Sequence, residues 1–433
     1  MTTPVTTSPH AQRRFAVVGG GVAGLTAAYV LSRSAHVTLY ESDDRLGGHA
    51  DTHTVRSSDG SELAIDTGFI VHNERTYPTL LRLFSELGVR TQDSDMSMSV
   101  ACEGCGLEYA GARGVSGALP SLRTVTNLRY LHMVTEIPRF HRRARRVLAA
   151  DPSSAAAEQT LEDFLRTGKF SPYFVQHFMV PVVSCVWSCA PRTALEYPAV
   201  YLFAFLDHHG MLAISGSPTW RTVVGGSRSY VDAVARKLGA VRTGAPVRSV
   251  RRLGADRGVE VRGDDVADTY DGVVLATHPH QALSALADPT PLEDELLRAL
   301  PYSTNPTVLH TDTALLPTLP RARASWNYRL DRCDTDASDV LVSYDMNRLQ
   351  RLAASETYVV TLNPGGRVAD RDVVARMTYE HPVYTPRSVA AQRRLGELND
   401  GLIAFAGAYH GWGFHEDGAR SGVAAAKALG AWW

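Results

Sequence analysis

Phe15-Ala-Val-Val-Gly-Gly-Gly-Val-Ala-Gly-Leu-Thr-Ala-Ala-Tyr-Val-Leu31 is an unbroken run of small and apolar residues near the start of the chain. The run predicts a buried parallel strand, a glycine turn and an apolar helix. Gly19 permits the tight turn, Gly21 lets backbone N–H groups approach a phosphate, and Gly24 lets the helix pack close to the sheet. The helix begins at Val22 and Ala23, so its N-terminus faces the same anionic ligand.

A second strand, His36-Val-Thr-Leu-Tyr, follows and ends at Glu41, 22 residues after Gly19. A carboxylate at this spacing accepts hydrogen bonds from ribose hydroxyls, which makes the whole unit typical of dinucleotide binding. The chain continues Arg45-Leu-Gly-Gly48, where an arginine neutralises a pyrophosphate and Gly47 and Gly48 allow close backbone approach. With this R-x-G-G extension the sequence resembles the amine oxidase and phytoene desaturase superfamily of FAD proteins.

The resemblance implies further contacts with FAD along the chain. The stretch Glu62-Leu-Ala-Ile-Asp-Thr-Gly68-Phe69 is similar to a strand that reaches the flavin ring, although an ordinary β-turn at Asp-Thr-Gly explains the same residues. By the same analogy the backbone of Val247 contacts the adenine and the strand before Thr277 passes by the dinucleotide. A last strand leads to Gly407, and a final helix leaving at Gly418 points its N-terminus at the flavin.

Two departures from the amine oxidase pattern carry information. Relatives have Gly-Glu or Gly-Asp before the last helix, whereas this chain has Gly407-Ala408, so the carboxylate is expected from Glu416 or Asp417. The chain contains only three lysines, Lys169, Lys237 and Lys427, and none follows the Ala-Thr-His-Pro segment at residues 276–279. Because amine oxidases place a lysine there beside the flavin, the sequence disfavours typical amine oxidation.

Candidate catalytic residues come from the segments beside the expected flavin. His415 precedes Gly418, and its imidazole is suited to act as a base or to hydrogen-bond a substrate. Trp412 and Tyr409 are candidates for the wall of an apolar channel, and core packing is the competing interpretation. His49, just after the R-x-G-G turn, is an alternative near the ring.

At closer range, the chain resembles predicted NAD/FAD-binding proteins associated with cyclopropane-fatty-acid synthases and lipid modification. The residues that carry this resemblance include Ile65-Asp-Thr-Gly-Phe-Ile-Val-His-Asn73, Trp220-Arg-Thr-Val-Val-Gly-Gly-Ser-Arg-Ser-Tyr230 and Gly413-Phe-His-Glu-Asp-Gly418. The resemblance implies lipid or secondary metabolism and not a particular substrate.

We therefore predict an α/β flavoprotein of two domains, because 433 residues exceed the usual size of one domain. A discontinuous Rossmann-like FAD-binding domain is expected over residues 12–75, 215–285 and 395–433. A substrate-binding domain with an antiparallel sheet and helices is expected over residues 76–214 and 286–394. The substrate site is expected between the two domains, under the flavin.

Composition and charge exclude several classes of protein. With 44 Lys and Arg against 45 Asp and Glu, bulk charge does not favour nucleic acid, and 44% hydrophobic residues exclude disorder. The sequence predicts no transmembrane helix, and we expect a cytoplasmic protein. The five cysteines are expected to be reduced thiols without a metal, because zinc would have to join Cys102 and Cys105 to the distant, oddly spaced pair Cys185 and Cys189.

A basic segment suggests a partner. Arg139, Arg142, Arg143, Arg145 and Arg146 fall within eight positions of a predicted helix. Such a cluster is most often a solvated helix face, and it also suits peripheral contact with anionic lipid or with an acidic acyl-carrier protein. The sequence leaves the oligomeric state open.

The function predicted from these residues is an FAD-dependent oxidoreductase of the desaturase or dehydrogenase type. It would remove a hydride from a C–H bond of an apolar, acyl-lipid or polyketide-like substrate. The alternatives are oxidation of an amine or amide C–N bond, redox-neutral double-bond isomerisation, and a non-catalytic flavoprotein that accompanies a lipid methyltransferase.

Overall fold

The computed structural model describes residues 12–151, 159–213, 216–334 and 339–433. The run that opens the sequence forms strand β1 (Arg14–Val18) and helix α1 (Val22–Leu31), followed by β2 (His36–Tyr40). Phe15 and Val17 join one apolar core, and Ala16 and Val18 join another. The strand is thus buried on both faces, as expected for a central strand of a parallel sheet.

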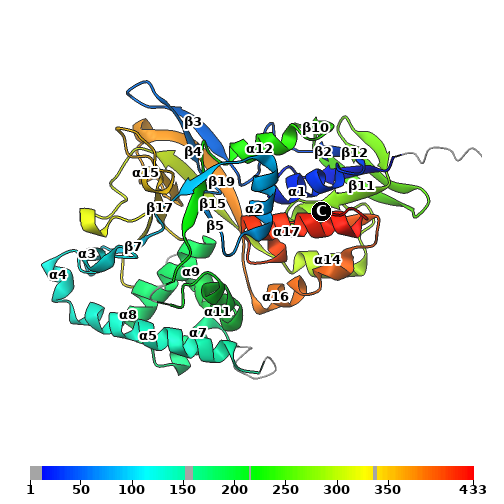
Figure 1. Ribbon diagram of the computed structural model, residues 1–433. Helices are drawn as coiled ribbons and strands as arrows, with labels where there is room; N and C mark the ends of the chain where they lie inside the picture. The colour runs from blue at the N-terminus through cyan, green and yellow to red at the C-terminus, as the bar shows by residue number, and fades with distance from the viewer. Residues whose placement is uncertain (1–11, 152–158, 214–215, 335–338) are drawn as a thin grey trace, which may run out of the picture.

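A five-stranded parallel sheet with the order β10-β2-β1-β14-β20 carries this strand at its centre. One face is covered by α1 and three other helices, and the opposite face by a three-stranded antiparallel sheet and further helices (Figure 1). The remaining elements are β10 (Ala240–Arg242), β14 (Gly272–Leu275), β20 (Ile403–Phe405), α2 (Pro78–Leu87), α12 (Arg228–Ala235), α17 (His415–Ala428), β11 (Val247–Gly254), β12 (Gly258–Gly263), β13 (Ala267–Tyr270), α13 (Pro279–Ala285) and α14 (Pro291–Arg298).

A second, seven-stranded sheet has the order β19-β15-β18-β17-β16-β7-β8. All its neighbours pair antiparallel except β16 and β7, which are parallel and join residues 98–102 to residues 326–330. Its strands are β7 (Met98–Cys102), β8 (Leu107–Gly111), β15 (Tyr302–His310), β16 (Trp326–Leu330), β17 (Val342–Asp345), β18 (Val359–Leu362) and β19 (Val373–Pro382).

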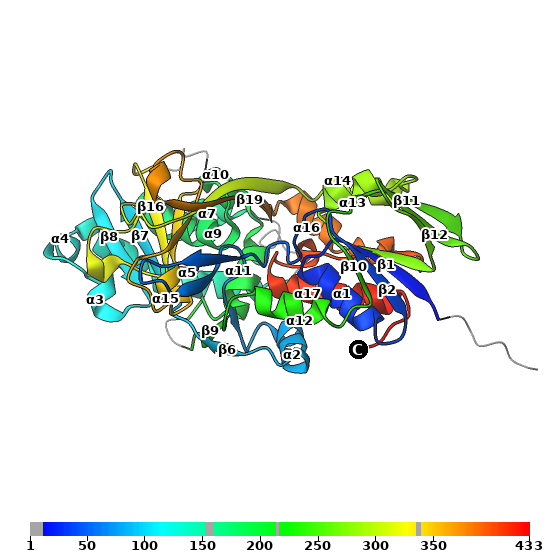
Figure 2. The same cartoon turned by 90° about the horizontal axis from the view of Figure 1, so that it is seen from above.

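Helices pack against this second sheet and share its apolar core, at the opposite end of the elongated molecule from β11 and β12 (Figure 2). Phe140, Phe164, Phe174 and Phe203 form the centre of this helical lobe. The helices are α3 (Gly114–Ala118), α4 (Leu122–Val125), α5 (Leu128–Leu148), α7 (Leu161–Thr167), α8 (Pro172–Phe174), the π-helix η1 (Val175–Met179), α9 (Val180–Trp187), α10 (Pro191–Glu196) and α11 (Ala199–His208).

Smaller elements lie between the two sheets or at the margins of the fold. A hairpin is formed by β3 (Thr52–Arg56) and β4 (Glu62–Asp66), and β5 (His72–Asn73), β9 (Trp220–Val223) and β6 (Thr91–Asp93) form a three-stranded sheet. The others are α15 (Met346–Leu349), α16 (Pro386–Gln392) and the 3-10 helices η2 (Pro320–Ala322), η3 (Asp370–Asp372), η4 (Leu395–Leu398) and η5 (Ala408–His410).

The predicted fold class is confirmed: a parallel α/β sheet carries the glycine motif, and a second sheet with helices forms the rest of the molecule. One local expectation was wrong. The final helix starts at His415 and not at Gly418. No helix in the described residues is long and apolar enough to cross a membrane.

Candidate functional site

A cavity of about 850 Å³ opens at the carboxyl ends of the parallel strands β1, β2 and β14. In open α/β sheets this edge is where ligands bind. Its lining draws together segments that lie far apart in the chain. The predicted cofactor residues that line it are Gly19, Gly21, Val22, Ala23, Glu41, Arg45, Gly48, Val247, Thr277 and Gly407.

The residues of this cavity fit a dinucleotide. A Cβ added at Gly21 meets no atom within 4 Å, so the backbone at the start of α1 is open to the cavity. The Glu41 carboxylate accepts a hydrogen bond of 2.6 Å from the Gly20 N–H, which ties the glycine turn to the end of β2. Arg45 lines the same cavity, and its guanidinium pairs with Asp51 at 3.1 Å. Open N–H groups, a carboxylate and an arginine match a pyrophosphate and a ribose.

Gly24, Gly47 and Gly418, which were also predicted as cofactor residues, lie outside this cavity and act through packing. A Cβ at Gly24 would stand 1.9 Å from the Gly19 carbonyl oxygen, which is the close helix packing predicted for it. At Gly418 it would meet Val22 at 2.6 Å, so this glycine allows α17 to approach α1. Gly47, with a φ of 113°, turns the backbone under the cavity. These residues shape the cavity and do not line it.

The carboxylates expected to replace the missing Gly-Glu pair serve a different purpose. Asp417 accepts a hydrogen bond from the Phe414 N–H at 3.1 Å and pairs with Arg420, and burial raises its pKa to about 6. Glu416 accepts from the N–H groups of Thr79 and Leu80, at the start of α2. Both side chains therefore cap helix N-termini, and neither lines the cofactor cavity. A contact between Asp417 and the cofactor stays a prediction, and its side chain is already engaged at the start of α17.

A second cavity, of about 600 Å³, lies between the second sheet and the helical lobe. The predicted residues Gly68 and Phe69 line this cavity and not the first. No Asp, Glu, Lys or Arg is found among the described residues of its wall. Most of that wall is apolar, including Met96, Met98, Val100, Phe140, Phe178, Met179, Val182, Val186, Trp187, Phe205, Trp326 and Leu362.

The two cavities share one wall, so a ligand in the first cavity can contact a ligand in the second. The predicted catalytic residues His49 and His415 both lie in it, together with His381 and Tyr379. The His49 ring centroid lies 4.6 Å from that of Tyr379 and 5.0 Å from that of His381. His415 stacks on Phe69 with 3.7 Å between the ring centroids. The shared wall is therefore an aromatic, imidazole-rich partition.

The histidines of the shared wall are neutral at pH 7. Burial lowers the pKa of His49 to about 4 and holds the pKa values of His381 and His415 well below 6.5. Nε2 of His415 is 3.0 Å from the Tyr230 hydroxyl, and Nδ1 of His381 accepts from the Asn305 amide at 3.0 Å. A neutral imidazole is able to accept a proton, so the partition offers proton acceptors without a fixed charge.

The other two predicted catalytic residues differ in position. Tyr409 lines the cofactor cavity and is fully buried. Trp412 lines neither cavity, because its ring packs beside Phe205 and His208 and its carbonyl accepts from Trp187 at 2.9 Å. The prediction of Trp412 as a channel wall is corrected: it supports the wall from behind.

Two residues of the partition were missed from the sequence. His381 and Tyr379 come from β19, whose alternation sends residues two apart to the same face of the sheet. A strand predicted over residues 373–382 would have placed them together. His278 was missed too; its Nδ1 lies 2.7 Å from Glu380, and both residues line the cofactor cavity.

Comparison with known proteins now gives the family. The model of the family described as flavin containing amine oxidoreductase matches residues 22–430. The chain belongs to this family. Membership makes FAD the cofactor and places the chain among FAD-dependent oxidoreductases, as the glycine motif and the R-x-G-G extension predicted.

Individual relatives are more distant. A protein of Mycobacterium tuberculosis that carries the name flavin-containing monoamine oxidase AofH is 30% identical over 287 residues, 64% of this chain and 60% of that protein. The carotenoid phi-ring synthase of Streptomyces griseus is 30% identical over 275 residues, 60% of this chain and 51% of the synthase. The matches thus span about half to three fifths of the relatives' length.

The fold is shared more widely than the sequence. The structure of cyclohexylamine oxidase from Brevibacterium oxydans IH-35A superposes with a TM-score of 0.70 at 16% identity, over 97% of this chain and 99% of that one. This likeness confirms the two-part fold of the family. The association with cyclopropane-fatty-acid synthases stays a prediction.

Proposed function

We propose that this family member oxidises an uncharged, apolar substrate by removing a hydride from a C–H bond, in the manner of a desaturase or dehydrogenase. The observation that carries the proposal is the wall of the second cavity, which has no Asp, Glu, Lys or Arg among its described residues. Burying an ammonium group without a partner is costly, whereas burying an acyl or polyene chain is favourable. The cavity volume of about 600 Å³ suits a small molecule with such a chain.

The lysines support the same proposal. Lys169, Lys237 and Lys427 all lie in the described residues, and none of them lines either cavity. Amine oxidases place a lysine beside the flavin, and none of these three lysines lies at the shared wall. Oxidation of an amine C–N bond is the less favoured alternative.

Oxidation of a C–H bond requires a hydride acceptor, a base and exclusion of water, and the residues of the shared wall would supply the last two. FAD, when bound, would accept the hydride, which carries both electrons of the oxidation. Removal of a hydride from one carbon and a proton from its neighbour leaves a double bond, so a base is required. We assign this role to His49, which lines both cavities and whose pKa of about 4 keeps it unprotonated at pH 7. Phe69 and Tyr379 keep water from the reacting carbons.

The reaction type is tested by product mass. Purified protein is incubated aerobically with acyl lipids and polyenes, and the products are analysed by mass spectrometry. A product lighter by two hydrogens supports the proposal. A rearranged product of unchanged mass would replace desaturation with isomerisation, and release of an aldehyde or ammonia from amines alone would overturn the proposal in favour of C–N oxidation.

We also propose that the helical lobe docks on an anionic membrane, from which such a substrate is taken. Leu122 of α4 and Leu128 of α5 are 83% and 79% exposed, unusual values for leucine. Further along, the same α5 exposes Arg142, Arg145 and Arg146 to solvent. Apolar side chains that enter lipid, together with arginines that pair with headgroups, suit a bilayer surface. Arg139 is engaged with Glu136 and does not contribute.

Vesicle sedimentation tests the docking surface. The protein is expected to pellet with phosphatidylglycerol vesicles and much less with phosphatidylcholine vesicles. Leu128→Ser and the double variant Arg142→Glu/Arg146→Glu should each remain in the supernatant, while Arg257→Glu, at an exposed arginine of the β11–β12 turn, should pellet normally. Equal, weak binding of all proteins to both vesicles would contradict membrane docking, and binding to an acidic acyl-carrier protein instead would assign the arginines to that partner.

A further inference from the structure

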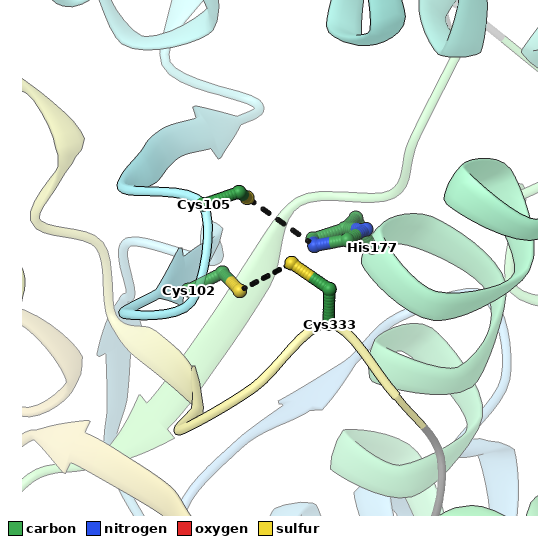
Figure 3. Close-up of side chains that lie close together, drawn as sticks. All are labelled: Cys102, Cys105, His177 and Cys333. Atoms are coloured by element: carbon green, nitrogen blue, oxygen red, sulfur yellow. Dashed lines mark hydrogen bonds between the residues drawn. The ribbon is translucent and has the colours of Figure 1, made fainter.

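Three cysteines and a histidine converge outside both cavities (Figure 3). Strand β7, which carries one of them, lies with α3 and α4 on the side of the molecule opposite β11 and β12 (Figure 1). Cys102 is the last residue of β7, Cys105 lies in the turn before β8, Cys333 follows β16, and His177 lies in η1. One ligand atom from each of the four lies within 4.8 Å of all the others. Segments more than 200 residues apart in sequence thus bring four soft ligands together.

The separations fit a tetrahedral metal site. Sγ of Cys102 is 3.5 Å from Sγ of Cys333, and Sγ of Cys105 is 3.6 Å from Nε2 of His177. Zinc bonds of about 2.3 Å to sulfur and about 2.0 Å to nitrogen place tetrahedral ligands about 3.5–3.8 Å apart. Only small movements would be needed to close the four ligands around one ion.

The surroundings orient these ligands. Nδ1 of His177 lies 3.2 Å from the Tyr173 carbonyl oxygen, and a hydrogen bond donated to this carbonyl leaves Nε2 free to face the thiols. The Tyr109 hydroxyl donates to the His177 carbonyl at 2.7 Å, within a π-helical turn of the kind often found at functional sites. Gly106, with a φ of 65°, forms the turn of the Cys102-x-x-Cys105 pair.

We propose that Cys102, Cys105, Cys333 and His177 bind one structural zinc ion. Four protein ligands without an open position are typical of structural zinc sites, and Cys-x-x-Cys supplies two of them with the usual spacing. This proposal departs from the sequence prediction of reduced thiols without a metal, for which only Cys185 and Cys189 were weighed as partners of the pair; those two belong to the buried apolar core of the helical lobe. The true partners are separated from the pair by 72 and 231 positions.

The proposed zinc would brace the substrate cavity. It would tie the β7–β8 turn and the loop after β16 to η1, and the next two residues of η1, Phe178 and Met179, line that cavity. Gly104 allows the β7–β8 turn to pack against the loop after β16, because a Cβ at this position would approach the backbone of Arg332 and Cys333 to 3.1 Å. The ion would thus act on the shape of the cavity from outside it.

Metal analysis of the full-length protein tests the proposal. The untagged protein, expressed with zinc and purified without chelator, is expected to hold about one zinc per chain by inductively coupled plasma mass spectrometry. Cobalt substitution should give the intense visible bands of tetrahedral thiolate coordination. Cys105→Ser and His177→Asn should lose the metal, whereas Cys189→Ala, a cysteine outside the cluster, should retain it.

A second measurement avoids dependence on the folding of variants. Treatment of the wild-type protein with a mercurial thiol reagent, in the presence of a chromophoric chelator, should release one zinc per chain. Protein that contains no zinc and takes up no cobalt would overturn the proposal. A Cys102–Cys333 disulfide found by peptide mass spectrometry in freshly purified protein would also overturn it, and would assign the close sulfurs to redox chemistry.

Discussion

The two cavities that meet at His49 differ in the kinds of residue that line them. The cofactor cavity lies at the ends of parallel strands, where its lining includes the glycines of the β1–α1 turn and charged side chains such as Glu41 and Arg45. The substrate cavity is formed by apolar side chains from helices and an antiparallel sheet, and its described wall carries no acidic, lysine or arginine side chain. The first is suited to an anionic ligand held by N–H groups, and the second to a neutral one held by buried apolar area.

The largest expected effect comes from filling the cofactor cavity. Gly21→Val should fold, since the backbone at Gly21 has a φ of −73° and an added Cβ meets no protein atom within 4 Å. The new side chain would occupy the space of the pyrophosphate, so the purified variant should be colourless by absorbance. Gly239→Val, at an exposed glycine with similar free space, serves as the control and should stay yellow. A yellow Gly21→Val would contradict this location of the cofactor.

Substitution of the proposed base in the shared wall should lower the rate of catalysis without changing the amount of bound cofactor. His49→Gln is expected to lower the rate of flavin reduction by about 10²–10⁴-fold, the usual contribution of a general base. The flavin content should not change, because the imidazole carries no charge for the cofactor to pair with. Stopped-flow absorbance measures the rate. A rate within a few-fold of the wild type would transfer the role of base to His381 or His415.

Narrowing the substrate cavity should change affinity more than chemistry. Val182 lines this cavity from α9, and Val182→Phe fills part of it. We expect KM to rise about 10-fold or more, within the range for an altered apolar pocket, with flavin content unchanged. Val374→Phe, at a side chain that is 41% exposed, is the matched control. An unchanged KM in Val182→Phe would mean that the substrate binds elsewhere.

The smallest effect concerns pH and stability. Burial lowers the pKa values of His49, His72, His209 and His410 to about 4, so between pH 6.5 and 4 the unfolded chain binds more protons than the native one. The free energy of unfolding should therefore fall as pH falls through this window, by at most about 1.4 kcal/mol per pH unit for each histidine.

Buried carboxylates oppose this trend. Burial raises the pKa values of Asp66 and Asp417 to about 6 and also raises those of Asp345 and Glu416, so on acidification the native protein takes up protons at these sites and gains stability. Burial lowers the pKa values of His381 and His415 as well, so the histidines outnumber the carboxylates, and a net loss is expected from pH 6.5 to 5. Denaturant unfolding at several pH values measures it, and His410→Asn should reduce the slope. Stability that increases on acidification would contradict the neutral state of these histidines.

The same contrast explains what could be predicted from sequence. Gly19, Gly21 and Glu41 follow from spacing alone, because a turn, a phosphate contact and a ribose contact each demand one residue type at one local position. His381 reaches His49 only through the pairing of β19 with β15, and Cys333 reaches Cys102 only through the pairing of β16 with β7. Pairing between strands so far apart in the chain leaves no pattern in the local sequence.

Other sequence predictions assigned a residue to the flavin site when its side chain has a structural role. Asp417 and Glu416 were expected at the flavin because carboxylates occur there in relatives. Their positions in the first turn of α17 make them helix caps, and the true start of that helix, at His415, was hidden by the glycines around it. Trp412 was predicted as a channel wall because its segment lies beside the expected flavin, and the competing interpretation of core packing describes its position beside Phe205.

The most direct test of the uncharged substrate cavity is an anaerobic titration of the flavin-loaded protein, followed by visible absorbance. Acyl lipids and primary alkylamines of the same chain length are added in separate experiments. We predict that the acyl lipids bleach the flavin band and that the amines leave it unchanged. Bleaching by the amines, with no response to any acyl lipid, would contradict the account and show that the apolar wall accepts a nitrogen substrate.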